Sequence, residues 1–203
     1  MNRLISACML SIVTFIFLIV GFCQAEEAPA ENTVQLVINK LKSTNLEERA
    51  SAIGSLGSMG PKAASAIPLL IAMLDDRQTV KRIDGSYLVE TNIMTAARNA
   101  LVKIGSASVV PLIGTFGDKT KYWVIRRNAA EALGALRDPR AIEPLIEFLK
   151  HKDDKSWDEY GFVADSTKTS LEKITGQSYQ NTGQNFGEDY SKWRNWYDVN
   201  RSK

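Results

Sequence analysis

The stretch that decides the fold is "RRNAAEALGALRDPRAIEPLI", residues 126 to 146. In this stretch and directly beside it, apolar residues recur at spacings of three and four, first in Ile125, Ala129, Ala132, Leu133 and Leu136 and then in Ile142, Leu145, Ile146 and Leu149. This spacing predicts two amphipathic helices. Asp138 suits the N-cap of the second helix, and Pro139 suits its first turn. Two such helices joined by a tight turn form an antiparallel helical hairpin.

The same unit recurs along the chain as a small residue, a leucine four positions later and a large apolar residue three positions after that. The four sets are Ala52, Leu56 and Met59; Ala97, Leu101 and Ile104; Ala129, Leu133 and Leu136; and Thr167, Leu171 and Ile174. A glycine or short polar turn follows each set, at Gly60, Gly105, Arg137-Asp138 and Thr175-Gly176. The leucines lie 45, 32 and 38 residues apart, which places the extra residues in loops. Periods of this size built from helix pairs predict an α-solenoid.

The first 25 residues, "MNRLISACMLSIVTFIFLIVGFCQA", carry one cation and no further charge before Glu26. Cys23 and Ala25 stand three and one positions before a cut after Ala25, which is typical of a secretory signal peptide. The alternative is an uncleaved anchor, because the uncharged run is long enough to span a bilayer. Both cysteines of the chain lie in this leader. We therefore expect an exported protein of the periplasm or cell envelope that contains no disulfide.

The predicted fold is all-α: an α-solenoid of about four HEAT-like hairpins with a C-terminal aromatic capping helix. We divide the chain into a signal peptide (1–25), a flexible lead-in (26–33), the repeat array (34–176) and a C-terminal loop and capping helix (177–203). Trp193, Trp196 and Tyr197 fall on one face of that last helix, and terminal repeats need such capping.

Residues 126–146 resemble the HEAT-like repeat of the phycobilisome-lyase type, whose pattern runs Arg, then Ala-Ala-x-Ala-Leu-Gly, a short turn, and an apolar helix with Pro. Residues 49–74 and 95–114 match it more loosely. The tail "FGEDYSKWRNWY" is similar to the closing segment of exported bacterial HEAT-repeat proteins. The resemblance covers residues 34 to 176 and implies a helical solenoid. Relatives with this repeat attach or isomerise chromophores in the cytoplasm, so the export leader argues against that activity here.

The residue inventory argues against most enzyme classes. The net charge of +2 predicts no field strong enough to gather nucleic acid or an anionic membrane. His151 is the sole histidine, so neither a histidine metal site nor a Ser-His or Cys-His pair is expected. Four carboxylates do cluster in "DDKSWDEY", at Asp153, Asp154, Asp158 and Glu159. A solvated loop is the simpler interpretation, because Lys152 and Lys155 stand among them. We expect no catalytic residue, no cofactor and no metal.

Aromatic residues in the loops that enter the repeats suggest a binding surface. Tyr122 and Tyr160 each lie eleven residues before their repeat leucine, Tyr87 and Trp157 each lie fourteen before, and Trp123 adjoins Tyr122. Equivalent positions of stacked repeats line up along one edge, and aromatic anchors with a polar surround are favoured in protein interfaces. The alternative is that these rings pack into the interhelix turns.

The sequence thus predicts a non-catalytic scaffold of the cell envelope that binds an unidentified protein or peptide through Tyr87, Tyr122, Trp123, Trp157 and Tyr160. It predicts no enzyme and no nucleic-acid partner, with membrane contact only if the leader is uncleaved. Two alternatives stay open. The first is an envelope enzyme or accessory factor, lyase-like by family analogy, that uses the loop carboxylates. The second is a membrane-anchored spacer.

Overall fold

The computed structural model describes residues 28–84, 87–155 and 160–201, so the predicted leader lies outside the described part. The elements in chain order are α2 (Ala28–Lys40), α3 (Leu46–Met59), η1 (Gly60–Ala66), α4 (Ile67–Ala72), β1 (Thr79–Asp84), β2 (Tyr87–Asn92), α5 (Ile93–Ile104), η2 (Ser106–Ser108), α6 (Val109–Gly117), α7 (Trp123–Leu136), η3 (Pro139–Ala141), α8 (Ile142–Leu149), α9 (Phe162–Thr175), α10 (Tyr179–Thr182) and α11 (Tyr190–Asn200). Within these ranges no single helix is long and apolar enough to cross a membrane. The segments Ile93–Ile104 and Ser106–Gly117 meet that test only together, as a pair bent by 113°.

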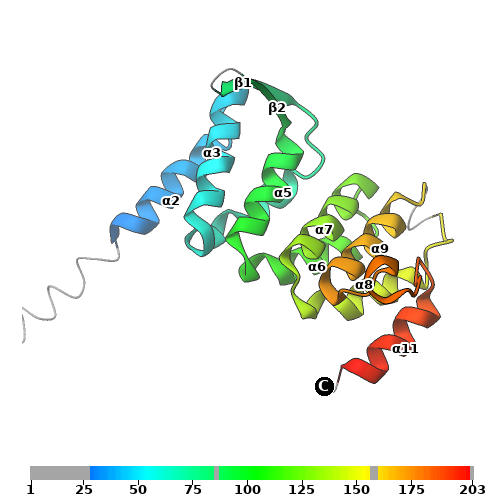
Figure 1. Ribbon diagram of the computed structural model, residues 1–203. Helices are drawn as coiled ribbons and strands as arrows, with labels where there is room; N and C mark the ends of the chain where they lie inside the picture. The colour runs from blue at the N-terminus through cyan, green and yellow to red at the C-terminus, as the bar shows by residue number, and fades with distance from the viewer. Residues whose placement is uncertain (1–27, 85–86, 156–159, 202–203) are drawn as a thin grey trace, which may run out of the picture.

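The helices form two stacked layers. Helices α3, α5, α7 and α9 lie side by side in chain order (Figure 1), and each packs against the next. Helices α4, α6, α8 and α11 form the second layer, with contacts from α4 to α6, from α6 to α8 and from α8 to α11. The pairs α3/α4, α5/α6 and α7/α8 are three hairpins, and α9 is the first helix of the fourth repeat, beside which α11 takes the place in the second layer through its contact with α8. This arrangement confirms the all-α, HEAT-like solenoid predicted from the repeat spacing.

The repeated positions form the interior between the layers. The leucines Leu56, Leu101, Leu133 and Leu171 are fully buried, and Ala52, Ala97 and Ala129 are at most 2% exposed. Thr167 takes the small position in the fourth repeat and is also fully buried. Its hydroxyl donates to the Val163 carbonyl at 2.7 Å, which satisfies the polar group inside the core. The three-four periodicity therefore identified the buried face of each helix correctly.

Left-handed backbone ends the first helix of every hairpin. Gly60, Gly105 and Gly176 have φ values of 58°, 87° and 73°, and Arg137 has 53° at the corresponding position. Arg137 is the sole non-glycine with positive φ among the described residues. The Asp138 side chain then caps η3 by accepting from the Arg140 N–H at 3.0 Å, with Pro139 in the first turn, as the sequence predicts.

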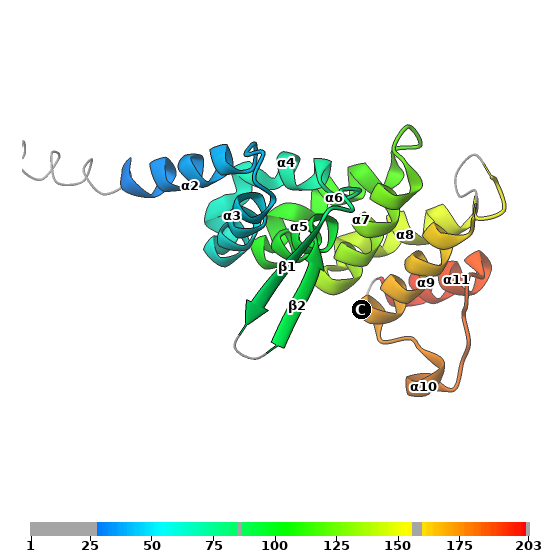
Figure 2. The ribbon, with the colours of Figure 1, turned by 90° about the horizontal axis from the view of Figure 1, so that it is seen from above.

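Two segments outside the stacked hairpins carry structure that the sequence analysis did not anticipate. The residues inserted between the first two repeats form the antiparallel pair β1–β2, in register from Thr79↔Asn92 to Asp84↔Tyr87. This β-hairpin projects away from the helices when the molecule is seen from above (Figure 2). Helix α2 begins at Ala28, so most of the predicted flexible lead-in is helical instead. Val34, Ile38 and Leu41 explain this, because they bury the face of α2 that meets α3 and η1.

Helix α11 closes the C-terminal end of the array against α8. Trp193 is fully buried there, packs edge-on against Phe186 with ring centroids 4.8 Å apart, and donates its indole N–H to the Gly187 carbonyl at 2.9 Å. Arg194 adds ion pairs to Glu143 and Glu147 of α8 at 3.1 and 3.2 Å. The aromatic stripe of the tail is thus a packed end of the solenoid.

Candidate functional site

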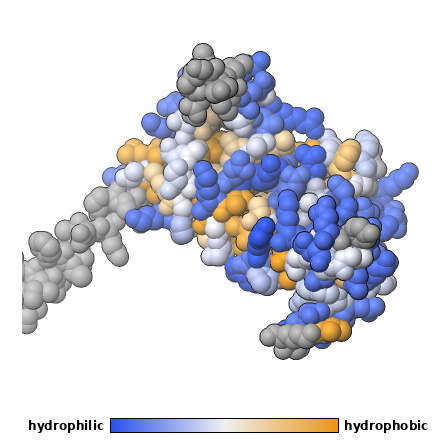
Figure 3. Space-filling model, viewed as in Figure 1, coloured by the Kyte–Doolittle hydropathy of each residue, from blue (hydrophilic) through white to orange (hydrophobic). Residues whose placement is uncertain are grey.

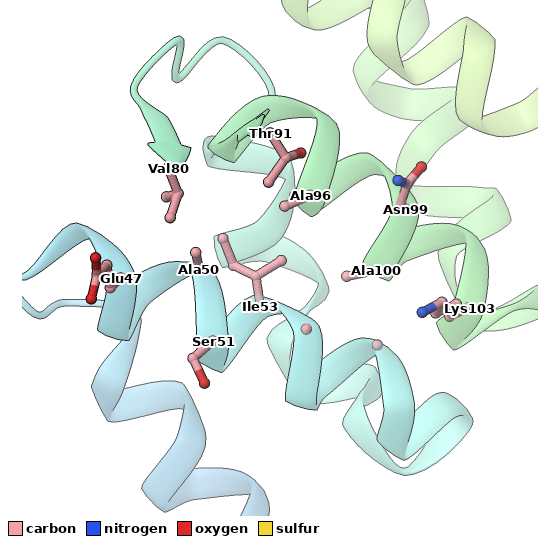
Figure 4. Close-up of a pocket in the computed structure, with 12 residues that line it drawn as sticks. Glu47, Ala50, Ser51, Ile53, Val80, Thr91, Ala96, Asn99, Ala100 and Lys103 are labelled. Atoms are coloured by element: carbon pink, nitrogen blue, oxygen red, sulfur yellow. The ribbon is translucent and has the colours of Figure 1, made fainter. Parts of the chain in front are cut away.

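A groove runs along the outer side of the seam between α3 and α5, with a volume of about 600 Å³. Figure 4 shows its floor, built by Ala50 and Ile53 of α3 and by Ala96 and Ala100 of α5. Val80 and Thr91 of the β-hairpin stand over it. The remaining lining residues are Glu47, Ser51, Gly54, Gly57, Asn99 and Lys103. Ligand sites are typically apolar hollows of this size with a few polar groups.

Small residues keep this groove open. A Cβ placed on Gly54 would meet no atom within 4 Å, whereas one on Gly57 would lie 3.1 Å from the Ala100 Cα. The helices therefore touch at Gly57, and the space above Gly54 is left unfilled by side chains. Two charged groups mark the ends, with Glu47 at the end near the β-hairpin and Lys103 at the other (Figure 4). The groove is thus apolar in its middle and oppositely charged at its two ends.

The β-hairpin is held over the groove by bonds at its base. The backbone N–H groups of Ile93 and Met94 donate to the carbonyls of Gln78 and Asp76 at 2.9 and 2.8 Å. Arg49 of α3 donates to the Gln78 side chain at 3.1 Å, which ties the base to the other wall of the groove. Because an isolated two-stranded hairpin is marginally stable in water, these contacts and the burial of Val80 hold it in place.

Polar contacts fill the next two seams of the same layer. Arg98 of α5 forms an ion pair with Glu131 of α7 and donates to the Asn128 side chain at 3.0 Å. Arg127 approaches the same Glu131 at 3.5 Å, and the Ser166 hydroxyl of α9 donates to it at 3.4 Å. Glu131 is therefore shared by two guanidinium groups and one hydroxyl at the junction of three helices.

Three of the five predicted partner-binding residues come together. The ring centroid of Trp123 lies 5.5 Å from that of Tyr122 and 5.8 Å from that of Tyr160. Phe162 joins them, 5.0 Å from Trp123 and 6.0 Å from Tyr160. We call Tyr122, Trp123, Tyr160 and Phe162 the aromatic edge. The sequence analysis missed Phe162, although it lies two residues after Tyr160 at the first position of α9.

The other two predicted residues are not brought to this cluster by the described structure. Tyr87 belongs to strand β2 and Trp157 lies outside the described residues. Trp123 is half-buried, whereas Tyr122 and Tyr160 are 52% and 58% exposed, so packing into the interhelix turn accounts for one ring and leaves two in solvent.

The loop carboxylates form no site in the part of the chain that the structure describes. Asp153 is exposed and pairs with the adjacent Lys152 at 2.8 Å, while Asp158 and Glu159 lie outside the described residues. Across residues 28–84, 87–155 and 160–201, no three His, Cys, Asp or Glu side chains gather to hold a metal ion. The pKa of Asp118 is lowered because Thr120 donates two hydrogen bonds to it, and that of Asp138 because Arg140 donates to it. Both carboxylates are thus kept ionised, which suits turn capping better than proton transfer.

Comparison with known proteins identifies the repeats. A family model described as the PBS lyase HEAT-like repeat matches residues 48–76 and 125–151, which are the α3–α4 and α7–α8 hairpins. The chain carries HEAT-like repeats of the phycobilisome-lyase type. It is 34% identical over 128 residues to the phycocyanobilin lyase subunit alpha of Nostoc sp. (strain PCC 7120 / SAG 25.82 / UTEX 2576). The match takes in 61% of this chain and 44% of the relative, so the chain spans less than half of that protein.

A solved structure of this repeat class is also similar. It is the complex of CpcE and CpcF of phycocyanin lyase from Nostoc sp. PCC7120, at 25% sequence identity and a TM-score of 0.46. The similarity covers 87% of this chain and 70% of the solved chain.

The similarity to the lyase subunit corrects the predicted function. The expectations of a non-catalytic scaffold and of a protein that is not an enzyme are wrong, because the curated relative is a lyase subunit. The physical reason is that an enzyme subunit can act by binding and orienting a reactive ligand, which requires no histidine pair, nucleophile or metal ligand of its own.

Proposed function

We propose that this chain is a subunit of a lyase-related enzyme that acts on an open-chain tetrapyrrole, and that the α3–α5 groove holds this ligand. The observation that carries the proposal is the 34% identity to phycocyanobilin lyase subunit alpha over 128 residues. A subunit role is consistent with the residues of the groove, which offer binding groups and no nucleophilic cysteine or histidine. The chain's own contribution is then to bind the ligand, orient it and exclude water from one side of it.

The groove suits a long, flat, largely apolar ligand with charged substituents. Its volume of about 600 Å³ lies within the range of small-molecule sites. Phycocyanobilin is an open-chain tetrapyrrole with two carboxylates, and Lys103 is placed to pair with one of them. At the other end, Glu47 is placed to accept hydrogen bonds from pyrrole N–H groups. Ala50, Ala96 and Ala100 provide an apolar floor against which the conjugated system would lie.

Binding of phycocyanobilin to the purified full chain tests this proposal. We expect a saturable change in its visible absorbance and induced circular dichroism. The variant Gly54→Trp should abolish this change, because the new side chain would occupy the groove without displacing backbone. Lys103→Gln should weaken binding about tenfold, as expected for the loss of one charge-assisted contact.

The matched control is Val110→Trp, which adds the same side chain at a position of α6 that is 63% exposed and belongs to the opposite layer. It should bind phycocyanobilin like the natural chain. Equal binding of phycocyanobilin by Gly54→Trp and Val110→Trp would show that the ligand does not bind in the groove. A lack of binding by all forms would overturn the tetrapyrrole proposal itself.

Location is a separate proposal. The leader predicted over residues 1–25 supports export to the periplasm or cell envelope, where a tetrapyrrole-handling subunit would act outside the cytoplasm. N-terminal sequencing of the protein isolated from its native cells tests it. We expect a mature chain that begins at Glu26. Recovery of the chain from the cytosolic fraction with its first 25 residues still attached would contradict export.

A further inference from the structure

The aromatic edge exposes a large area of ring surface to solvent. Tyr122, Tyr160 and Phe162 are 52%, 58% and 48% exposed. The other strongly exposed large apolar residues in the described part are the scattered aliphatic residues Leu36, Val110 and Val199. Single exposed apolar residues need no explanation, but a contiguous group of rings marks an interaction site.

The rings of the aromatic edge pack on one another and are not a cage. Trp123 is the half-buried anchor, and its ring centroid lies 5.0 to 5.8 Å from those of the other three residues. Rings at this separation are in van der Waals contact, so no slot is left between them for a flat molecule. A ligand must therefore lie across their outer faces, as the side chain of a docked peptide does.

Positive charge borders these rings. The guanidinium of Arg127 lies 5.6 Å from the centre of the Trp123 ring and approaches Glu131 at 3.5 Å. The same Glu131 is already paired with Arg98. On the next turn of α9, Lys168 and Asp165 balance each other at 3.8 Å. The two guanidinium groups share one carboxylate, so Glu131 neutralises the charge of only one of them.

We propose that the aromatic edge and Arg127 together form a docking site for an acidic segment of a protein partner. An apolar or aromatic side chain of the segment lies across Tyr160 and Phe162, and a flanking carboxylate pairs with Arg127. Tyrosine, tryptophan and arginine are the residues that dominate the binding energy of protein interfaces. The site is distinct from the α3–α5 groove, so it does not depend on the proposed tetrapyrrole ligand.

Three synthetic pentapeptides test the proposal, each with a central phenylalanine flanked on both sides by two glutamates, two glutamines or two lysines. Binding to the full chain is followed by titration calorimetry and by the NMR signals of the arginine side-chain N–H groups. We expect the glutamate peptide to bind about tenfold more tightly than the glutamine peptide and to shift the Arg127 signal. The lysine peptide should bind most weakly, because its positive charges would face the guanidinium of Arg127.

Variants separate the two halves of the site. Arg127→Gln should weaken binding of the glutamate peptide about tenfold. It should leave the glutamine peptide unaffected. Arg127→Lys should lose only part of the affinity for the glutamate peptide, because lysine keeps the positive charge but lacks the planar guanidinium group that binds a carboxylate through two hydrogen bonds. Tyr160→Ser and Phe162→Ser should weaken both peptides alike, and they serve as well if Arg127→Gln fails to fold.

Matched controls lie elsewhere on the molecule. Lys173→Gln removes one cation from the opposite end of α9, and Val110→Ser removes an exposed apolar side chain from α6. Both should bind the peptides like the natural chain. Equal affinity for the three peptides, or an unchanged affinity in Arg127→Gln, would overturn the proposal, and so would the absence of binding by every peptide. Phycocyanobilin binding, measured on the same proteins, reports separately on the groove.

Discussion

Neighbouring helices pack differently at the two ends of the first helical layer, although the same repeat motif occurs at both ends. Both α3 and α7 carry a glycine directly after the repeat leucine, Gly57 and Gly134. At Gly134 the neighbouring helix comes so close that a Cβ would lie 2.8 Å from the Ser170 Cα, whereas at Gly57 the nearest backbone atom would be 3.1 Å away. The α7–α9 seam is closed, and the α3–α5 seam opens into a groove. In the view of Figure 3, apolar residues show among hydrophilic ones over the N-terminal and middle parts of the molecule, and the C-terminal part is mostly hydrophilic.

This difference teaches that one sequence motif can serve packing in one repeat and binding in another. In the closed half, Glu131 and Ser166 bridge α7 and α9 with polar contacts. In the open half, the corresponding residues are Gly54 of α3 and Ala96 of α5, which have no polar side chain that could bridge the two helices. The lack of a side chain at Gly54 leaves the volume that a ligand can occupy.

Gly134→Ala should give the largest effect and would break the closed seam. The new methyl group would collide with the Ser170 backbone and displace its hydroxyl, which donates to the Ala130 carbonyl at 2.8 Å. We expect a loss of about 3 kcal/mol in the free energy of unfolding, from overpacking and a lost hydrogen bond. Urea denaturation followed by tryptophan fluorescence measures it. A loss below about 1 kcal/mol would show that α7 and α9 separate easily.

Asn128→Ala should rank second. Asn128 is fully buried and donates to the carbonyls of Leu74 and Val124 at 3.0 and 2.9 Å, so its removal leaves buried acceptors unpaired. We expect a loss of about 2 kcal/mol in the free energy of unfolding. The control is Asn99→Ala on the rim of the open groove, which should change it by less than about 0.5 kcal/mol. Similar losses in the two variants would erase the distinction between the seams.

Gly57→Ala and Gly54→Ala sharpen the comparison within the open half. A methyl group at Gly57 meets the Ala100 Cα at 3.1 Å and the flexible Lys103 chain at 3.3 Å, so we expect a loss of about 1 kcal/mol. A methyl group at Gly54 meets nothing within 4 Å and should stabilise the chain by up to about 1 kcal/mol through helix propensity. Thermal unfolding of both variants checks the opposite signs. A stabilised Gly57→Ala would mean that the groove extends further along the seam.

Arg137→Gly should have the smallest effect and concerns the turn of the closed half. The corresponding turns use Gly60, Gly105 and Gly176, whereas Arg137 holds a left-handed conformation at φ 53° despite its Cβ. Relief of this strain should raise the free energy of unfolding by about 0.5 kcal/mol after the entropic cost of glycine. Arg137→Ala is the control, because it removes the side chain and keeps the strain. A destabilised Arg137→Gly would indicate that the arginine side chain stabilises the turn more than the strain costs.

Some features were predictable because they depend on local chemistry. The turn at Asp138 and Pro139 needed only a capping carboxylate and a residue with fixed φ. The β-hairpin was missed, although "TVKRIDGSYLVETN" places the pair Gly85-Ser86, a typical two-residue hairpin connection, between two segments that contain β-branched residues. The aromatic edge was found in part, since Tyr122 and Tyr160 share a position relative to their repeat leucines. The groove was not found, because its walls are small residues that look like ordinary helix packing.

By itself, the sequence determined which faces of the helices are buried and where the helices turn, because periodicity, caps and glycines act within a few residues. It also indicated the class of repeat through the motif of residues 126–146. Only the tertiary structure decided that α3 and α5 leave a groove while α7 and α9 close, and that Tyr160 and Phe162 pack against Trp123. Those features depend on the distances between helices about 30 to 45 residues apart in the chain. Such distances follow from how all the layers pack at once, and no local pattern encodes them.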